Sequence, residues 1–471
     1  MDKQAAWIRW GLLSASFLLA TPGLGAAQTF TSGSTGADGP FNPTCTPTPC
    51  TVTVTLPPDG IFNFTTVNIP AGVTVRFTRN AANTPVILLA TGNVTIIGTI
   101  DVSGGSGTAF GRPGPGGQGG FEGGAGADGI TSAVGGFGLG PGGGGPANAQ
   151  SAGGGGGGYL TAGTNGRRGF GITGTPGTGG PAYGSTALRP ILGGSGGGGG
   201  GGSVGGSNGG GGGGGGGAIA IASSTRVTLN TTGLITIRAN GGDGSFGSGG
   251  GGGGSGGAIR VIAPTISGVG QLRAEGGSGG NLGGQGANGR IRVEATTLTY
   301  NGFTRPLATS GFPQPVFPVA GQPTLTIASV GGVAAPASPS GSILAAPDIL
   351  LPTGTTNPVV VTLTASNIPL GTTILVTATP QSGPPTSATS AGLTGTVASS
   401  TASASLTLSL TQPSVLVATA TFPLVAAAGG GPIFAEGEEV KWVRVAATYG
   451  GGSTVTYITA SGKEVRAEEL R

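Results

Sequence analysis

Side chains that could carry out catalysis are scarce in this chain. Its 471 residues include no histidine, and charged residues make up only 8% of them. Between residues 60 and 305 the acids are widely spaced: Asp101, Glu122, Asp128, Asp243, Glu275 and Glu294. Glycosidases need two carboxylates around the scissile bond, and calcium sites gather several oxygen ligands. The sequence offers no convincing pair or cluster, so we predict no catalytic residue, no metal site and no cofactor.

Four arginines form the most suggestive polar pattern. When similar segments are aligned, Arg238 stacks on Arg273, and Arg260 stacks on Arg292. Like charges at strand spacing repel one another, so an anionic partner would be favoured there. The simpler interpretation is that these arginines are solvated on the outer face of a sheet. The glycine runs are not phosphate loops, because such loops need a following helix.

The first residues are typical of a secretory signal over 1–27. Lys3 and Arg9 precede an apolar stretch from Gly11 to Ala20, which is too short to cross a bilayer, and small residues follow near Ala27. We expect export to the cell surface or medium, with no membrane span after cleavage. In an exported protein the pair Cys45 and Cys50 is expected to form a local disulfide. The formal net charge of +4 is small for this length and argues against nucleic-acid binding.

The elements that must position these residues belong to an internal repeat. A short alternating strand runs into paired glycines at Gly98–Gly105, Thr236–Gly242 and Gly270–Gly277. Similar strands return at Gly217–Ala222, Gly257–Ala263 and Gly289–Ala295. Self-similarity with insertions at one corner is typical of a solenoid. We therefore predict an all-β protein with a short right-handed parallel β-helix over 59–305.

Alternation along the strands predicts which side chains face the core. One inward column contains Val73, Ile100, Ile237 and Leu272, and the next contains Val75, Val102, Ala239 and Ala274. The return strands contribute Ile219, Ile259 and Ile291, followed by Ile221, Val261 and Val293. Leu298 and Phe303 are expected to supply the core of the last coil. The residues between these positions, including the four arginines and Glu275 and Glu294, are expected to point outward.

Glycine-rich insertions interrupt the helix at about 104–217, 243–257 and 276–289, and glycine supplies 108 residues of the chain. One interpretation is flexible loops, since ordering glycine costs the most backbone entropy. The other is a packed bundle of polyglycine-II helices, which have three residues per turn and no internal hydrogen bonds. Glycine tracts can approach closely because no side chain obstructs them. A rigid solenoid would hold their ends together and lower the cost of ordering.

The remaining segments differ in composition. Residues 28–58 form an N-terminal leader with the disulfide, and 306–323 are a proline-rich linker. Residues 324–430 carry short strands split by Pro, Gly and Ser, which indicates an Ig-like β-sandwich. Residues 431–471 are richer in charge and are predicted to form a C-terminal β-hairpin segment.

The strands, the Gly-Gly corners and the motif Gly-Gly-Ala-Ile-Arg-Val-Ile-Ala at 256–263 resemble glycine-rich exported bacterial proteins of the β-helix adhesin type. The resemblance covers about 60–305 and implies a secreted or cell-surface structural or adhesive role without catalysis. Its implied partner is an extracellular polysaccharide or a cell-surface component. The alternative is a carbohydrate-binding or carbohydrate-processing β-helix. An ice-binding module is a third hypothesis, since the glycine tracts look like those of glycine-rich antifreeze proteins.

Overall fold

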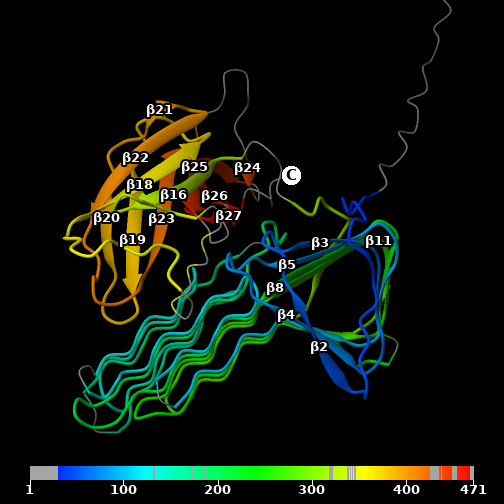
Figure 1. Ribbon diagram of the computed structural model, residues 1–471, viewed down its shortest axis with the longest axis horizontal. Coiled ribbons are helices and arrows are strands. Elements are labelled where there is room, and N and C mark those ends of the chain that lie inside the picture. The colour runs from blue at the N-terminus through cyan, green and yellow to red at the C-terminus, as the bar shows by residue number, and fades with distance from the viewer. Residues whose placement is uncertain are drawn as a thin grey trace, which may run out of the picture.

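The protein is all-β in the computed structural model, with parallel and antiparallel sheets (Figure 1). The structure describes residues 30–466 with gaps at 110, 131–132, 171–172, 185, 231, 318–321, 337–338, 340, 342, 344–345, 425–433, 436–437 and 448–452. No helix occurs in the described part of the chain. The predicted signal at 1–27 lies outside the described residues. Two parts follow one another along the chain, a parallel region (30–317) and an antiparallel region (322–466).

The parallel region contains two sheets in which every pairing is parallel. The larger sheet consists of β1 (Gly39–Phe41), β3 (Ile61–Ile69), β5 (Val86–Ala90), β6 (Val94–Ile96), β8 (Ala218–Ser223), β9 (Arg226–Leu229), β11 (Ala258–Gly268), β13 (Arg290–Tyr300) and β15 (Thr309–Gly311). The smaller sheet runs in the order β14 (Thr304–Arg305), β12 (Gln271–Arg273), β10 (Ile235–Arg238), β7 (Thr99–Asp101), β4 (Val73–Thr78) and β2 (Cys50–Thr55). Successive passages of the chain therefore lie in layers. The disulfide between Cys45 and Cys50 is confirmed at the start of this region.

Most of the predicted register is confirmed. Ile237 pairs with Ile100 on one side and with Leu272 on the other. In the return strands Ile259 pairs with Ile219 and Ile291, and the next inward position follows the same register. These inward side chains have at most 2% of their surface exposed. Alternation within each strand was sufficient to find them, because a shift by one residue would turn every side chain to the other face.

Two expectations about the core are wrong. Ile100 pairs with Val75 and not with Val73, so the first layer is shifted by two residues from the predicted alignment. A two-residue shift keeps the same residues inward, and burial alone could not reveal it. Leu298 and Phe303 are exposed, at 43% and 54%, instead of filling the last layer. Among the described strands, none stacks beyond them to create an interior.

Both faces of the larger sheet are covered in its middle. The inner faces of the two sheets enclose one apolar core. A second cluster lies on the other face of β5, β8 and β11, where Tyr159, Leu188 and Ile191 pack on Ile87 and Ala220. The hydroxyl of Tyr159 donates a hydrogen bond to the carbonyl of Leu192 at 2.9 Å. Burial on both faces explains why β5, and β8 as far as Ala222, are continuously apolar and do not alternate.

The described residues of the glycine tracts are ordered and form what we call the glycine bundle (within 103–217, 239–257 and 274–289). Figure 1 shows them as layered, wavy lines that run side by side away from the strands. Their backbone amides bond to neighbouring tracts with a period of three residues. For example, the amides of Gly210, Gly213 and Gly216 donate to the carbonyls of Gly249, Gly252 and Ser255, at 2.8 to 2.9 Å. Three residues per turn without internal hydrogen bonds is the repeat of the polyproline II type of helix.

The tract 209–217 illustrates how completely the bundle satisfies its backbone. Its amides donate in rotation to the tracts 118–127, 249–255 and 102–108. Its carbonyls accept from the tracts 194–200, 114–117 and 242–245. Six neighbours thus surround one tract, and all nine of its residues are buried. A buried backbone without partners would be costly, so this exchange of hydrogen bonds makes the buried tract tolerable.

The antiparallel region contains two further sheets. One runs β17 (Val333–Ala334), β16 (Thr324–Val330), β18 (Val359–Ser366), β22 (Ser399–Leu406) and β21 (Thr394–Thr396). The other consists of β20 (Thr386–Thr389), β19 (Ile374–Pro380), β23 (Ser414–Pro423), β24 (Phe434–Ala435), β25 (Glu438–Ala447), β26 (Ser453–Thr459) and β27 (Glu464–Arg466). Strands from both sheets share one apolar core. The predicted C-terminal hairpin is present as β25 and β26, and β25 also pairs with β23.

A small contact joins the glycine bundle to the antiparallel region. Phe121 and Leu139 of the bundle pack with Val415 and Ile343. The buried carboxylate of Glu122 accepts the backbone amide of Ile343 at 2.7 Å and the guanidinium of Arg79 at 3.1 Å. One acid therefore links the loop after β4, the bundle and the antiparallel region.

Candidate functional site

The most continuous charged feature is an arginine column on the outer face of the smaller parallel sheet. Its members occupy one register position in successive strands: Arg76, Asp101, Arg238, Arg273 and Arg305. Parallel in-register pairing repeats at about 4.8 Å, so these side chains stack along the sheet. Sequence reasoning found the middle of the column. It missed Arg76 because of the two-residue shift, and Arg305 because that strand has only two residues.

Asp101 neutralises one end of the arginine column. Its carboxylate accepts Arg76 at 2.8 Å, and only 6% of the Asp101 side chain is exposed. Burial raises the pKa of Asp101, but hydrogen bonds from Ser103 and Arg76 and the charge of Arg238 outweigh it, so the pKa lies below its usual value. The pairing register places Asp101 beside Arg238, while the ion pair itself is made with Arg76.

Glu275 neutralises the other end. Its two carboxylate oxygens accept Arg273 at 3.2 Å and Arg305 at 2.9 Å. The guanidinium of Arg273 also donates to Gln271 and lies 5.8 Å from the ring centroid of Phe303. The column thus holds more positive than negative charge, yet most of its arginines already have an acceptor within the chain. Partial exposure still leaves the column accessible to a partner along one side.

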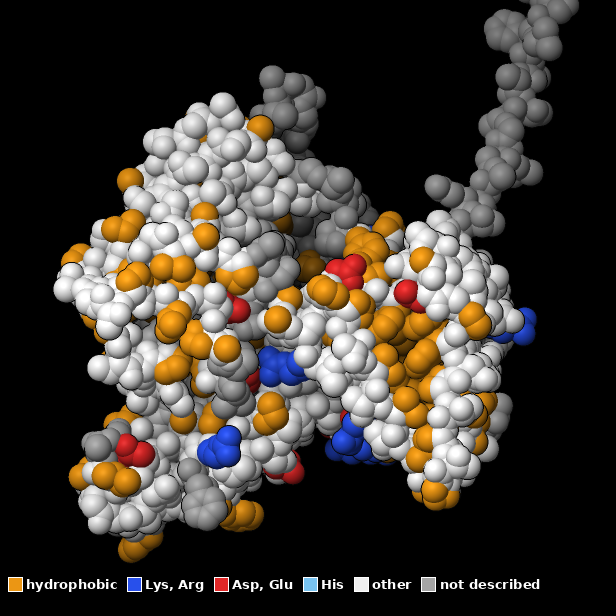
Figure 2. Space-filling model, in the orientation of Figure 1, with side chains coloured by type: hydrophobic (Ala, Val, Ile, Leu, Met, Phe, Trp, Pro, Cys, Tyr) orange, Lys and Arg blue, Asp and Glu red, His pale blue; other side chains and the backbone are white. Residues whose placement is uncertain are grey.

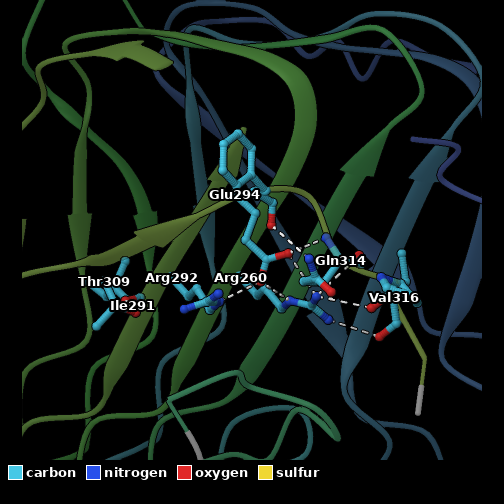
Figure 3. A network of polar contacts seen from close by, with 9 residues as sticks. Arg260, Ile291, Arg292, Glu294, Thr309, Gln314 and Val316 are labelled. Atoms are coloured by element: carbon cyan, nitrogen blue, oxygen red, sulfur yellow. Dashed lines mark hydrogen bonds and ion pairs between the residues drawn. The ribbon is translucent and has the colours of Figure 1, made fainter. Parts of the chain in front are cut away.

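The second arginine pair belongs to a buried network (Figure 3). Arg260 is 1% exposed and Glu294 is 0% exposed, although both lie on the outer face of the larger sheet. The guanidinium of Arg260 donates to both carboxylate oxygens of Glu294, at 3.2 and 3.0 Å. Arg292, which lies two residues before Glu294 in β13 and is 15% exposed, donates to the same carboxylate. Glu294 thus points outward from the sheet as expected, but it is buried and does not face solvent.

The chain after β15 covers this buried network. The carbonyls of Pro315 and Val316 accept Arg260 at 3.1 Å, and the amide of Gln314 donates to Glu294 at 2.9 Å. A bidentate pair with additional backbone partners is the arrangement that offsets the desolvation of buried charges. The network fixes the segment 314–316 on the sheet. Arg260 is therefore enclosed by the chain itself. Of the two predicted arginine pairs, Arg238 with Arg273 in the arginine column is the more accessible.

The other acids do not form a catalytic arrangement among the described residues. Asp243 accepts the amide of Ser278, and Asp128 accepts the amide of Ile130. Glu122 is engaged as described above. No group of three or more Asp, Glu or Cys side chains gathers as metal ligands within the part of the chain that the structure describes.

The described residues also form two apolar features. A cleft of about 990 Å³ lies in the antiparallel region, with Ile327, Leu351, Leu408 and Leu416 among its lining residues and Asp348 as its acid. At the turns between glycine tracts, large apolar side chains are exposed: Ile130, Phe170, Val204 and Phe246. The amide of Gly206 bonds to the carbonyl of Gly129, so the turns that carry Val204 and Ile130 are neighbours.

Comparison with known proteins gives no match: no family model, no curated protein and no solved structure is significantly similar to this chain. Among the described residues, no helix has the length and apolar character needed to cross a membrane.

Proposed function

We propose that this is a secreted or cell-surface structural or adhesive protein without catalytic activity, of the glycine-rich β-helix adhesin type. In this proposal the parallel region is a short right-handed parallel β-helix. Its insertions form a polyglycine-II bundle, and the antiparallel region is an Ig-like β-sandwich. The observation that carries the proposal is the six-neighbour hydrogen bonding of the tract 209–217. So much ordered backbone without side chains is suited to holding a shape.

The bundle supports an adhesive role because it presents turns on a rigid support. Binding residues are often placed on loops that a scaffold holds in position. Phe170 and Phe246 are 107% and 71% exposed at such turns. Exposed aromatic side chains contribute large contact areas at interfaces. Exposing these rings to water is unfavourable in the free protein, and contact with a surface would bury them.

The ion-pairing of the acids supports the absence of catalysis. A general acid or base needs an accessible carboxyl group whose protonation can change. Glu122 and Glu294 are almost fully enclosed and hold arginines, and Asp101 is held ionised by its donors. The contacts of each of these acids are those of a residue that stabilises the fold.

The alternative, a carbohydrate-binding or carbohydrate-processing protein, is favoured by the arginine column. Arg238, Arg273 and Arg305 lie along one face, with the ring of Phe303 beside Arg273. Cationic and aromatic groups together would suit an acidic polysaccharide lying along the layers.

The two functions separate in one set of measurements. Protein-coated beads are tested for retention on cells and surfaces, and the same protein is tested on a glycan array and for release of reducing sugar. The adhesive proposal predicts that Phe170→Ser with Phe246→Ser lowers bead retention severalfold. The matched control Leu375→Ser, at a 47% exposed position of β19, should leave retention unchanged. Reducing-sugar release lost in Glu275→Gln would contradict the proposal, and array binding lost in Arg238→Gln with Arg273→Gln would favour the alternative.

A further inference from the structure

The two ends of the parallel region are built differently. One inward column runs through the whole smaller sheet: Val52, Val75, Ile100, Ile237, Leu272 and Thr304. The four middle members have 0% of their surface exposed, whereas Val52 is only partly buried. The column therefore begins on an uncovered apolar residue and ends on a polar one.

The C-terminal end is closed in the manner expected of a stack of repeats, whose last unit carries a polar outer side. The hydroxyl of Thr304 accepts the amide of Ala308 at 2.9 Å. Arg305 in the same strand is 61% exposed. The chain then continues directly into β15 and the segment that covers Glu294. This end carries positive charge, but it also exposes apolar side chains: Leu298, Phe303, Leu307 and Phe312 are 43%, 54%, 87% and 70% exposed.

The N-terminal end is apolar and open. Val52, Val54, Phe41 and Phe62 pack on the core but remain partly exposed. The ring of Phe62 lies 5.3 Å from that of Phe64 and 5.9 Å from that of Phe77, so the exposed rings extend the core outward. Figure 1 looks onto this end, and Figure 2 shows hydrophobic side chains gathered in the area beside β2. An apolar surface of this kind is typical of an interface.

The edge of the sheet at this end is also unprotected. Among the described strands β2 pairs only with β4, so its other edge keeps free amides and carbonyls. Natural edges are usually guarded by charges or by a covering segment. From Gly39 to Leu56 the chain has no charged residue, and Thr51, Thr53 and Thr55 alternate with the two valines. Nothing in β2 opposes pairing with another strand.

We propose that a second copy of this chain covers the N-terminal end, with the two β2 strands paired antiparallel across a twofold axis. Such an axis, perpendicular to the sheet, keeps Val52 and Val54 of both copies on the same face. The two cores would then join through one continuous sheet, and each strand would satisfy the free edge of the other. The absence of charge from Gly39 to Leu56 means that a self-complementary contact brings no like charges together. This inference does not depend on the adhesive role.

The ends themselves argue against other self-association. Head-to-tail stacking would place Val52 and Phe62 of one copy against Thr304 and Arg305 of the next. That contact would remove water from Arg305 and from its ion pair with Glu275, whose side chains are 61% and 21% exposed, and desolvating charged groups is costly. The isologous dimer pairs two uncharged β2 edges with each other and leaves Arg305 in water.

The test measures the mass of the purified full chain by sedimentation across a hundredfold range of concentration. We expect a species with twice the 44.4 kDa of one chain. Val54→Lys places a charge on the contact and should shift the dissociation constant upward by at least a hundredfold. The matched control Val360→Lys changes a 49% exposed valine in β18 and should leave the dimer intact. Melting curves establish that both variants fold.

A monomer of the unchanged protein at all concentrations would overturn the proposal, whatever the variants do. A dimer that survives Val54→Lys in a folded variant would place the contact elsewhere and equally reject it. Masses that rise beyond the dimer with concentration would indicate head-to-tail stacking. If Val54→Lys does not fold, Thr53→Lys provides the same charge from an exposed position of the same strand.

Discussion

Strand β10 and the glycine tract that follows it stack in the same layers, but the strand needs large side chains and the tract needs none. Ile237 in β10 pairs with Ile100 and Leu272, and its side chain fills the space between the sheets. A few residues later, Gly242 bonds to Gly214 and receives Gly254, with no side chain on any of the three. The strands are held together by the atoms they place between the sheets. The bundle instead depends on the absence of side chains, since only glycine lets six neighbouring tracts approach one tract so closely.

This difference teaches that one stacking geometry can be stabilised in two ways. In the sheet, apolar burial supplies the driving force at about 25 cal/mol per Å². In the bundle there is little side chain to bury, so hydrogen bonds, close backbone contacts and the anchored tract ends must offset the entropy of ordering glycine. Adding a methyl group should therefore be harmful in the bundle, and removing methyl groups should be harmful in the sheet.

The largest effect is expected from Gly213→Ala. A Cβ at Gly213 would overlap the carbonyl of Gly242, which belongs to the backbone and cannot rotate away. We expect a loss of about 4 kcal/mol or more of unfolding free energy, which is exceptional for one methyl group. Denaturant unfolding measures it, and hydrogen exchange across 209–217 should change from slow to fast.

The matched control is Gly205→Ala, where a Cβ would meet no atom within 4 Å and only the positive φ of +71° opposes it. That backbone conformation alone costs an alanine about 1–2 kcal/mol. Equal losses at both positions would show that the packing of the bundle contributes nothing, and the comparison with the sheet would fail.

The contrast also explains how far the sequence could lead. Period-two alternation placed Ile219, Ile237 and Ile259 correctly because each has a strong preference for one face of a strand. The first layer was shifted by two residues since Val73 and Val75 both face inward and only long-range pairing distinguishes them. For the tracts no side chain carries a pattern. Their order depends on which carbonyl each amide finds across the bundle, and the sequence of a glycine run cannot specify that locally.

The candidate sites show the same limit. Stacking Arg260 on Arg292 was correct, yet the sequence did not reveal that Glu294 lies between both guanidinium groups or that Pro315 and Val316 cover them. An acid two residues after Arg292, on the same face of the strand, was the signal available. Burial by a segment twenty residues later is a tertiary property, and the composition of a linker does not predict it.

A smaller effect tests the sheet side of the comparison. Ile237→Ala removes three carbon atoms from a position with no exposed surface, between Ile100 and Leu272. We expect a loss of about 2–5 kcal/mol, from lost burial and from the cavity that remains. The same truncation at Ile130, which is 75% exposed in the bundle, should stay within about 0.5 kcal/mol. Comparable losses at the two positions would mean that the bundle also relies on apolar burial.

The smallest effect is expected from removing the charge of Asp101, which lies where β7 ends and the glycine bundle begins. Burial raises the pKa of Asp101, but donation from Ser103 and Arg76 and the charge of Arg238 outweigh it and hold the pKa below its usual value of about 3.9. Because the folded pKa is lowered, the stabilisation is complete above the unfolded pKa and is lost as the pH falls through the folded value.

Asp101→Asn should therefore cost about 1 kcal/mol at pH 7 and progressively less below pH 4. Melting temperatures of both proteins between pH 7 and pH 2 measure this, and the two curves should converge at the acid end. Asp243→Asn, at an exposed carboxylate farther along the bundle, is the control and should show a smaller difference at pH 7. Parallel curves for Asp101→Asn over the whole range would show that the ionised carboxylate does not stabilise the junction, and the charge would then have no part in joining sheet to bundle.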